Sequence, residues 1–297
     1  MKNMSKGLVI SIVSNIYEVE DLEKQAIVKC IPRGKFKNTD TTIVVGDNVE
    51  FEYQTEDTGV INEIFERINY IKRPKMSNLT QMIFVLSMKM PKPDLLLLDK
   101  QLAFAEYNNI NSIIILNKID LEKNDKINEI EQLYKKIGYK VIKTNAKTGE
   151  GIEEVCKVLE NNVTAFSGNS GVGKSTLINN IFKKKLTLEG NISNKNQRGK
   201  NTTTSIKLYK LNEYAYIADT PGFSTFDIYE IESKDLAKYF IDLAYYIENC
   251  EFVGCTHIKE ETCGIKQAIQ KDKISLQRYE SYCRLYNELK EKELHKW

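Results

Sequence analysis

The sequence predicts a protein of three domains: a small OB-like β-barrel, a doubly wound α/β domain and a mostly helical C-terminal domain. Three observations support this prediction. Residues 7–75 alternate apolar and polar positions in short runs, strand and helix patterns alternate from Gln81 onward, and the stretch from about residue 236 is rich in tyrosine, charge and cysteine. We place the domains at residues 1–75, 76–235 and 236–297, because a chain of this length can bury more than one core.

Composition is that of a soluble protein in a reducing compartment. Apolar residues make up 41% and charged residues 28%, and no run approaches the roughly 18 apolar residues that span a bilayer. Acidic residues follow the short apolar stretch at the N-terminus without a small-residue cleavage site, which argues against a signal peptide. Six scattered cysteines do not make a disulfide scaffold. We therefore expect a cytoplasmic monomer with no membrane partner.

The N-terminal runs predict a five-stranded barrel. LVISIVSNIYEV, QAIVKCIPR, TTIVVGDNVEFEY and GVINEIFERINYI alternate with a period of two, and turn residues separate them. This pattern fits an OB-like barrel, and a sheet of another topology fits it as well. The turn-rich segment KRPKMSNLT, residues 72–80, marks the end of this part.

From Gln81 the pattern predicts an α/β domain. Strands are expected at IFVLSM, SIIIL, KVIKT, VTAFS and YAYIAD, and helices at DLLLLDKQLAFAEY, INEIEQLYKKI, GIEEVCKVLE and KSTLINNIF. Such alternation is typical of a parallel sheet with helices on both faces. Open sheets of this kind bind ligands beyond the carboxyl ends of their strands.

A phosphate-binding loop follows one of these strands. Residues 168–175 read GNSGVGKS and satisfy G-x-x-x-x-G-K-[ST] in full. Glycines let backbone N–H groups wrap the phosphates, Lys174 reaches the β and γ oxygens, and the Ser175 hydroxyl binds Mg²⁺. The predicted nucleotide contacts of this loop are Gly168, Asn169, Ser170, Gly171, Val172, Gly173, Lys174, Ser175 and Thr176.

Two other loops are expected to read a guanine base. Residues 117–120 read NKID after a strand, and the Asp120 carboxylate can accept from the pair of guanine N–H groups that adenine lacks. With adenine this carboxylate would be desolvated without partners. Residues 144–147 read TNAK and resemble the Ser-Ala-Lys loop whose main-chain N–H meets guanine O6. The chain is therefore predicted to bind GTP and GDP, with base contacts at Asn117, Lys118, Ile119, Asp120, Asn145, Ala146 and Lys147.

Elements that sense the third phosphate come later in the chain. Asp219-Thr220-Pro221-Gly222 matches D-x-x-G, in which Asp219 holds Mg²⁺ through water and the Gly222 N–H meets the γ-phosphate. Upstream, residues 201–204 read NTTT, and one threonine is expected to close over Mg²⁺. Thr203 is our candidate, with the register left open.

The base-reading loops precede the phosphate loop, so the order of elements is a cyclic shift of the usual one. Cutting a doubly wound sheet at one loop and joining its old ends preserves every strand neighbour, provided that those ends lie close together. The central domain is therefore predicted to be a circularly permuted P-loop GTPase domain. Its second switch leads directly into the C-terminal domain.

Two further patterns point to a metal and to nucleic acid. Cys250, Cys255, His257 and Cys263 supply a complete tetrahedral set for one structural Zn²⁺, although reduced cysteines in a helical core are the alternative. Between Lys183 and Lys210 there are eight basic residues and one acidic residue. This surplus could meet a polyphosphate backbone, or it could be a solvated, lysine-rich loop.

Together these motifs resemble the RsgA-type circularly permuted GTPases, the ribosome small subunit-dependent GTPases. The resemblance covers nearly the whole chain, from the OB-like barrel through LNKID and DTPGF to the C-x4-C-x-H-x5-C cluster. It implies a factor that binds 16S rRNA late in maturation of the small (30S) ribosomal subunit. It also implies that this subunit stimulates GTP hydrolysis and that the factor leaves after hydrolysis.

Two positions complicate the catalytic prediction. Phe223 follows D-x-x-G where Ras-like enzymes place a water-orienting glutamine, and Asn201 stands where members of the family often carry a histidine. An amide can orient water but cannot shuttle a proton. We therefore expect slow intrinsic turnover, with Lys174, Ser175, Thr203 and Asn201 as catalytic candidates. The alternative is an RNA-binding assembly module in which GTP is a structural ligand with little turnover.

Overall fold

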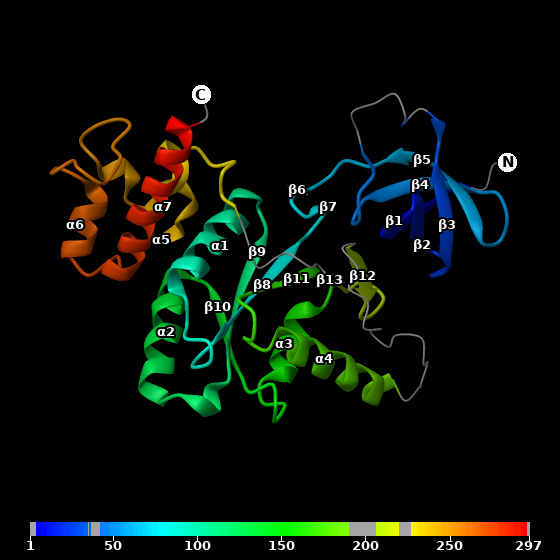
Figure 1. Ribbon diagram of the computed structural model, residues 1–297, viewed down its shortest axis with the longest axis horizontal. Coiled ribbons are helices and arrows are strands. Elements are labelled where there is room, and N and C mark those ends of the chain that lie inside the picture. The colour runs from blue at the N-terminus through cyan, green and yellow to red at the C-terminus, as the bar shows by residue number, and fades with distance from the viewer. Residues whose placement is uncertain (1–3, 35, 37–41, 190–205, 220–226, 296–297) are drawn as a thin grey trace. The chain divides into compact units, whose positions relative to one another are not determined.

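The computed structural model describes residues 4–34, 36, 42–189, 206–219 and 227–295 (Figure 1). Two compact units make up the chain. The first comprises Met1–Met82, Ile152–Phe166 and Leu177–Phe223, and the second comprises Ile83–Gly151, Ser167–Thr176 and Ser224–Trp297. Within the described ranges, every helix is too short or too polar to cross a bilayer.

The first unit begins with a closed five-stranded barrel. Its strands pair in the order β1-β2-β3-β5-β4, and β4 pairs back onto β1. All these pairs are antiparallel except β3 with β5. The predicted OB-like barrel is confirmed. The strands are β1 (Met4–Val13), β2 (Ile16–Asp21), β3 (Ile27–Pro32), β4 (Asn48–Tyr53) and β5 (Thr58–Ile64), and the core is formed by Val9, Val19, Val28, Cys30, Ile43, Val49, Phe51 and Ile61.

Strand β12 (Lys207–Lys210) extends this sheet and was missed by the sequence analysis. It pairs antiparallel with β13 (Tyr216–Asp219) and, at Lys207, with Ser11 of β1. Lys207 also lies 3.2 Å from the Glu18 carboxylate, and Lys210 pairs with Glu20. The remaining elements of this unit are β6 (Tyr70–Lys72), β7 (Lys75–Ser77), α3 (Ile152–Leu159), most of β11 (Val163–Ser167) and most of α4 (Lys174–Glu189).

The second unit carries the other predicted strands and helices of the α/β domain. Its strands lie in the order β10-β9-β8, with β9 and β10 parallel. Asp94 caps the first helix, where its carboxylate accepts from the Leu97 N–H at 3.0 Å. The elements are β8 (Gln81–Ser87), α1 (Leu95–Tyr107), β9 (Asn111–Asn117), α2 (Asn124–Ile137) and β10 (Lys140–Thr144).

The C-terminal part is mostly helical, as predicted, and packs on α1. Ala103 of α1 shares one apolar cluster with residues of the C-terminal helices, such as Phe240 and Leu285. Figure 1 shows α1 between β9 and α7. The elements are 3-10 helices at Ser233–Tyr239 and Ile247–Asn249 and the α-helices α5 (Ile241–Ala244), α6 (Gly264–Gln270) and α7 (Leu276–Leu294). The predicted domain boundaries at residues 75 and 235 stay predictions.

A buried ionic cluster fastens α1 to the C-terminal helices. Arg278 of α7 donates to Asp99 of α1 at 2.6 Å and to Asp242 of α5 at 2.8 Å, and its guanidinium lies over the Phe240 ring. Asp99 also accepts from the Tyr134 hydroxyl at 2.7 Å. Burial alone would lower the pKa of Arg278, but the two carboxylates raise it, so the side chain stays charged.

Candidate functional site: a nucleotide pocket and a metal cluster

Asn117 joins the three loops that the sequence analysis assigned to the nucleotide. Its Nδ2 donates to the Val172 carbonyl of the phosphate loop at 2.8 Å. Its Oδ1 accepts from the Thr144 hydroxyl at 3.0 Å and from the Ala146 N–H at 3.1 Å, both in the second base loop. The side chain is 1% exposed, so these bonds are shielded from water. Loops that lie far apart in the chain are thus held together by one amide.

Lys118 makes a second link between the base loop and the phosphate loop. It has φ of +61°, a left-handed conformation that turns the chain out of β9 into a 3-10 helix at Ile119–Leu121. Its Nζ donates to the Gly171 carbonyl at 2.6 Å and also to the Met90 carbonyl. The lysine stem therefore spans from the base-reading loop to the phosphate loop.

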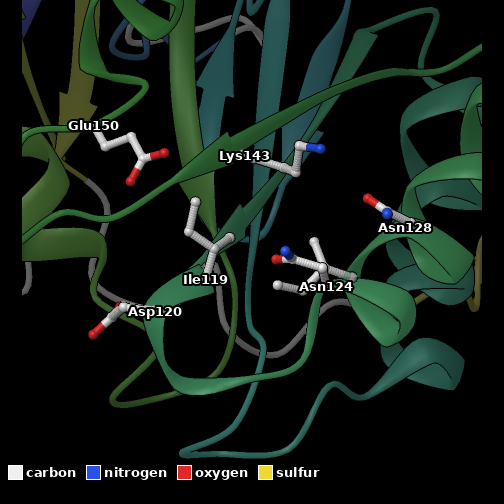
Figure 2. Close-up of a pocket in the computed structure, with 7 residues that line it drawn as sticks. Ile119, Asp120, Asn124, Asn128, Lys143 and Glu150 are labelled. Atoms are coloured by element: carbon white, nitrogen blue, oxygen red, sulfur yellow. The ribbon is translucent and has the colours of Figure 1, made fainter.

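Asp120 is exposed and lines a polar cavity of about 510 Å³ beside the base loop (Figure 2). In Figure 2 its carboxylate points away from the side chains of Asn124 and Asn128. The exposed acceptor is thus free of these neighbours, as the predicted readout of guanine requires. The other residues around the cavity are Ile119, Ile127, Lys143 and Glu150.

The second base loop is ordered by Asn145. Its buried Oδ1 accepts from the Lys147 N–H at 3.1 Å, and its own N–H donates to Glu150. A main-chain N–H of this loop is expected to meet guanine O6, and the Ala146 N–H donates to Asn117. If the Ala146 N–H is that group, Asn117 and the base share it.

Lys174 lies inside the phosphate loop that it is predicted to complete. Its Nζ donates to the Asn169 carbonyl at 2.9 Å and to the Gly168 carbonyl. Burial lowers the pKa of this ammonium. Lys174 also begins α4, so Ser175 and Thr176 lie in the first turn of that helix. The N–H groups of a first turn have no partner within the helix, which suits an anion.

Two glycines allow the phosphate loop to approach its neighbours closely. Gly173 has φ of +102°, and a Cβ there would lie 2.3 Å from Asn117 Nδ2. Gly168 has φ of +140°, and a Cβ there would lie 2.3 Å from the Val85 carbonyl. Both the left-handed backbone and the lack of space require glycine.

Replacing Gly173 by alanine is expected to weaken GTP binding by about tenfold or more, because the new methyl group must break the Asn117–Val172 hydrogen bond. Calorimetric titration measures the effect. Gly138→Ala is the matched control, since Gly138 also has a positive φ of +114° but nothing lies within 4 Å of its added Cβ. Equal losses in both variants would show that the collision with Asn117 is unimportant.

Several predicted site residues cannot be placed in this pocket. Asn201, Thr203 and Gly222 lie outside the described residues. Asp219 ends β13 in the first unit and is half-buried. The contribution of Thr144 was missed by the sequence analysis, although its place before Asn145 in the second base loop was a usable signal.

Four side chains of the C-terminal part form a candidate metal centre. Their ligand atoms all lie within 4.8 Å of one another. The His257 Nδ1 is 3.4 Å from Cys250 Sγ and 3.5 Å from Cys263 Sγ, and the two sulfurs are 3.9 Å apart. Tetrahedral zinc separates its ligands by about 3.8 Å for two sulfurs and about 3.6 Å for sulfur and nitrogen. The four ligand residues, Cys250, Cys255, His257 and Cys263, therefore fit a structural Zn²⁺.

Surrounding groups hold this cluster in place. The Gly264 N–H points at Cys250 Sγ at 3.3 Å, a contact that orients the sulfur. Burial lowers the pKa of His257, which favours the neutral imidazole that a metal needs. Tyr279 and Tyr282 of α7 donate to the carbonyls of His257 and Thr256 at 2.7 and 2.8 Å.

Removing the metal is expected to loosen the C-terminal helices, because Cys263 is fully buried in their core. We expect Cys263→Ser to lower the midpoint of thermal unfolding by about 5 °C or more and to abolish a zinc content of one per chain. Calorimetry and elemental analysis measure both. Cys156→Ser, outside the cluster, is the control. A wild-type chain without zinc would refute the metal assignment.

The pocket defines a class of protein: a P-loop GTPase in which the base-reading loop precedes the phosphate loop. Comparison with known proteins agrees with this class. The model of the RsgA GTPase family matches residues 64–229, and that of the RsgA N-terminal domain matches residues 6–61. The chain belongs to the RsgA family of GTPases.

Relatives match this chain over almost its full length. Proteins called small ribosomal subunit biogenesis GTPase RsgA are 38% identical in Thermotoga neapolitana and 39% identical in Alkaliphilus metalliredigens. The first match covers 96% of both chains, and the second covers 97% of this chain and 98% of the relative. The assignment supports GTP hydrolysis, with GTP, GDP and Mg²⁺ as ligands.

Two solved structures share the fold. YjeQ from Thermotoga maritima has a TM-score of 0.86 at 36% identity, covering 96% of this chain and 98% of its own. YloQ, described as a circularly permuted GTPase, has a TM-score of 0.83 at 31% identity, covering 98% of this chain and 96% of its own. The predicted fold class is therefore confirmed.

Proposed function

We propose that this protein hydrolyses GTP as an assembly factor in late maturation of the small (30S) ribosomal subunit. It binds 16S rRNA, is stimulated by the subunit and leaves after hydrolysis, acting as a cytoplasmic monomer. The observation that carries the GTPase part is the set of hydrogen bonds by which Asn117 joins the base loops to the phosphate loop. The names of the relatives support the ribosomal part.

In this proposal each loop has one task. Asp120 selects guanine, the N–H groups around Gly171 bind the β-phosphate, and Lys174 neutralises charge between the β and γ oxygens. Ser175, with Asp219 through water, would hold Mg²⁺, which supplies further charge neutralisation at these oxygens. Thr203 and the Gly222 N–H are assigned to the γ-phosphate. Asn201 remains a candidate for orienting the attacking water.

The basic stretch between Lys183 and Lys210 offers less charge to RNA than its composition indicates. Lys184 lies 3.3 Å from Glu153, Lys207 lies 3.2 Å from Glu18, and Lys210 pairs with Glu20. Paired ammonium groups contribute less to counterion release than free ones. We therefore assign rRNA contact within this stretch mainly to its other basic residues, of which Lys195, Arg198 and Lys200 lie outside the described residues.

A second candidate function is favoured by Phe223, which replaces the usual water-orienting glutamine. In that case the protein is an RNA-binding assembly module, and GTP is a structural ligand. GTP turnover with and without purified small subunits separates the two. We expect slow turnover alone and faster turnover with subunits. Negligible turnover in both, with GTP still bound, would favour the module. An unchanged stimulated rate in Asn201→Ala would remove Asn201 from catalysis.

A further inference from the structure

Helix α1 contacts the residue that precedes the phosphate loop on one side and the C-terminal helices on the other. Gln101 and Asp99 are two residues apart, which places them about 200° apart around the helix axis. Gln101 reaches Ser167, the residue before the phosphate loop, and Asp99 reaches Arg278 of α7. One rigid element therefore touches both regions.

Contact with the start of the phosphate loop is made by a buried amide that bonds the preceding residue, Ser167. Gln101 Nε2 donates to Ser167 Oγ at 2.9 Å, and the two residues are 2% and 0% exposed. Gln101 also lines a small cavity together with Gly168 and Asn169, whose carbonyls accept from Lys174. The position of Gln101 therefore affects the backbone of the phosphate loop, which must wrap the phosphates.

Contact with the C-terminal helices is made by charge and by packing. Asp99 is fully buried and bonds Arg278, and Lys100 lies 2.8 Å from Glu288 of α7. Ala103 belongs to the apolar core of those helices. An ionic cluster of this kind is sensitive to small displacements, because a separated charge would be left buried and unpaired.

We infer that Gln101 is a positioning residue for the phosphate loop and that α1 transmits the packing of the C-terminal helices to it. This inference rests on the proposed binding of GTP. A partner that moves the C-terminal helices would then change nucleotide affinity by way of Asp99, α1 and Gln101. The reverse also holds, because coupling between two sites is reciprocal.

The test compares GTP, GDP and ATP affinities by calorimetry in matched variants. Gln101→Leu is expected to weaken GTP and GDP about tenfold each, with the preference for GTP over ATP unchanged, since the base loops are not altered. Asp99→Asn is expected to weaken both about threefold, although its side chain faces away from the loop. Asp242→Asn weakens a bond within the C-terminal helices but leaves the Arg278–Asp99 bond to α1 in place, so it is expected to leave affinity unchanged.

Each outcome decides the matter. Equal losses in Asp99→Asn and Asp242→Asn at equal thermal stability would reduce the effect to general destabilisation and overturn the inference. An unchanged affinity in Gln101→Leu would also overturn it. If Asp99→Asn fails to fold, Lys100→Ala with Glu288→Gln tests the same helix from its partly exposed side, and losses below twofold in both would count against coupling. A wild-type chain that binds no GTP would instead refute the proposed function.

Discussion

Replacing Lys174 by alanine is expected to reduce GTP hydrolysis by about a hundredfold to a thousandfold. The ammonium is half-buried in the phosphate loop, where its Nζ donates to the Asn169 carbonyl at 2.9 Å. Burial lowers the pKa of Lys174, because removing the ammonium from water destabilises its charged form. The attraction between a phosphate and this cation is stronger than it would be in bulk water, because the Lys174 ammonium is half-buried.

Single-turnover hydrolysis measures this loss at saturating GTP. Lys183→Ala is the control, since Lys183 is an exposed lysine further along the same helix. A Lys174→Ala variant that hydrolyses GTP at the wild-type rate would remove Lys174 from the catalytic candidates. It would then favour a role for the loop in binding alone.

Replacing Arg278 by leucine is expected to lower the free energy of unfolding by about 3–5 kcal/mol. The guanidinium is 1% exposed and pairs with Asp99 at 2.6 Å and Asp242 at 2.8 Å. Removing it leaves two carboxylates buried without their cation. Loss of one partner leaves a buried charge without its counter-ion. It therefore lowers the stability of the fold more than loss of the whole cluster does.

Urea unfolding followed by tyrosine fluorescence or circular dichroism measures the change. Arg284→Leu is the matched control, because Arg284 lies on the same helix but is exposed. The variant with Asp99→Asn and Asp242→Asn added to Arg278→Leu should recover part of the loss. A loss below about 1 kcal/mol in Arg278→Leu would show that the cluster is not buried as described.

Local motifs predict much of the candidate site from sequence. The phosphate loop, the base loop and the metal ligands are short patterns in which chemistry fixes both residue type and spacing, and strands flanking them follow from runs such as SIIIL and KVIKT. The observed β9 and β10 include these runs. The shifted order of the loops does not prevent the site from being predicted, because each motif is recognised from its own residues.

Long-range polar contacts were not predictable. Arg278 and Asp99 are 179 positions apart in the sequence. No local sequence pattern around either residue predicts that they form a buried ion pair. Gln101 lies in a helix whose leucines indicate only a core face, so its contact with Ser167 depends on tertiary packing. Strand β12 was missed because lysines occupy both of its ends, and its pairing with β1 is also a tertiary contact.

Nucleotide selectivity tests most directly whether the reordered loops form one guanine-nucleotide pocket. In calorimetric titration of the full chain, GTP should bind at least about a hundredfold more tightly than ATP. Asp120→Ala should remove most of that difference. Lys174→Ala should instead lower the affinity for both nucleotides. Equal binding of GTP and ATP by the wild-type chain, or an unchanged preference in Asp120→Ala, would contradict the account.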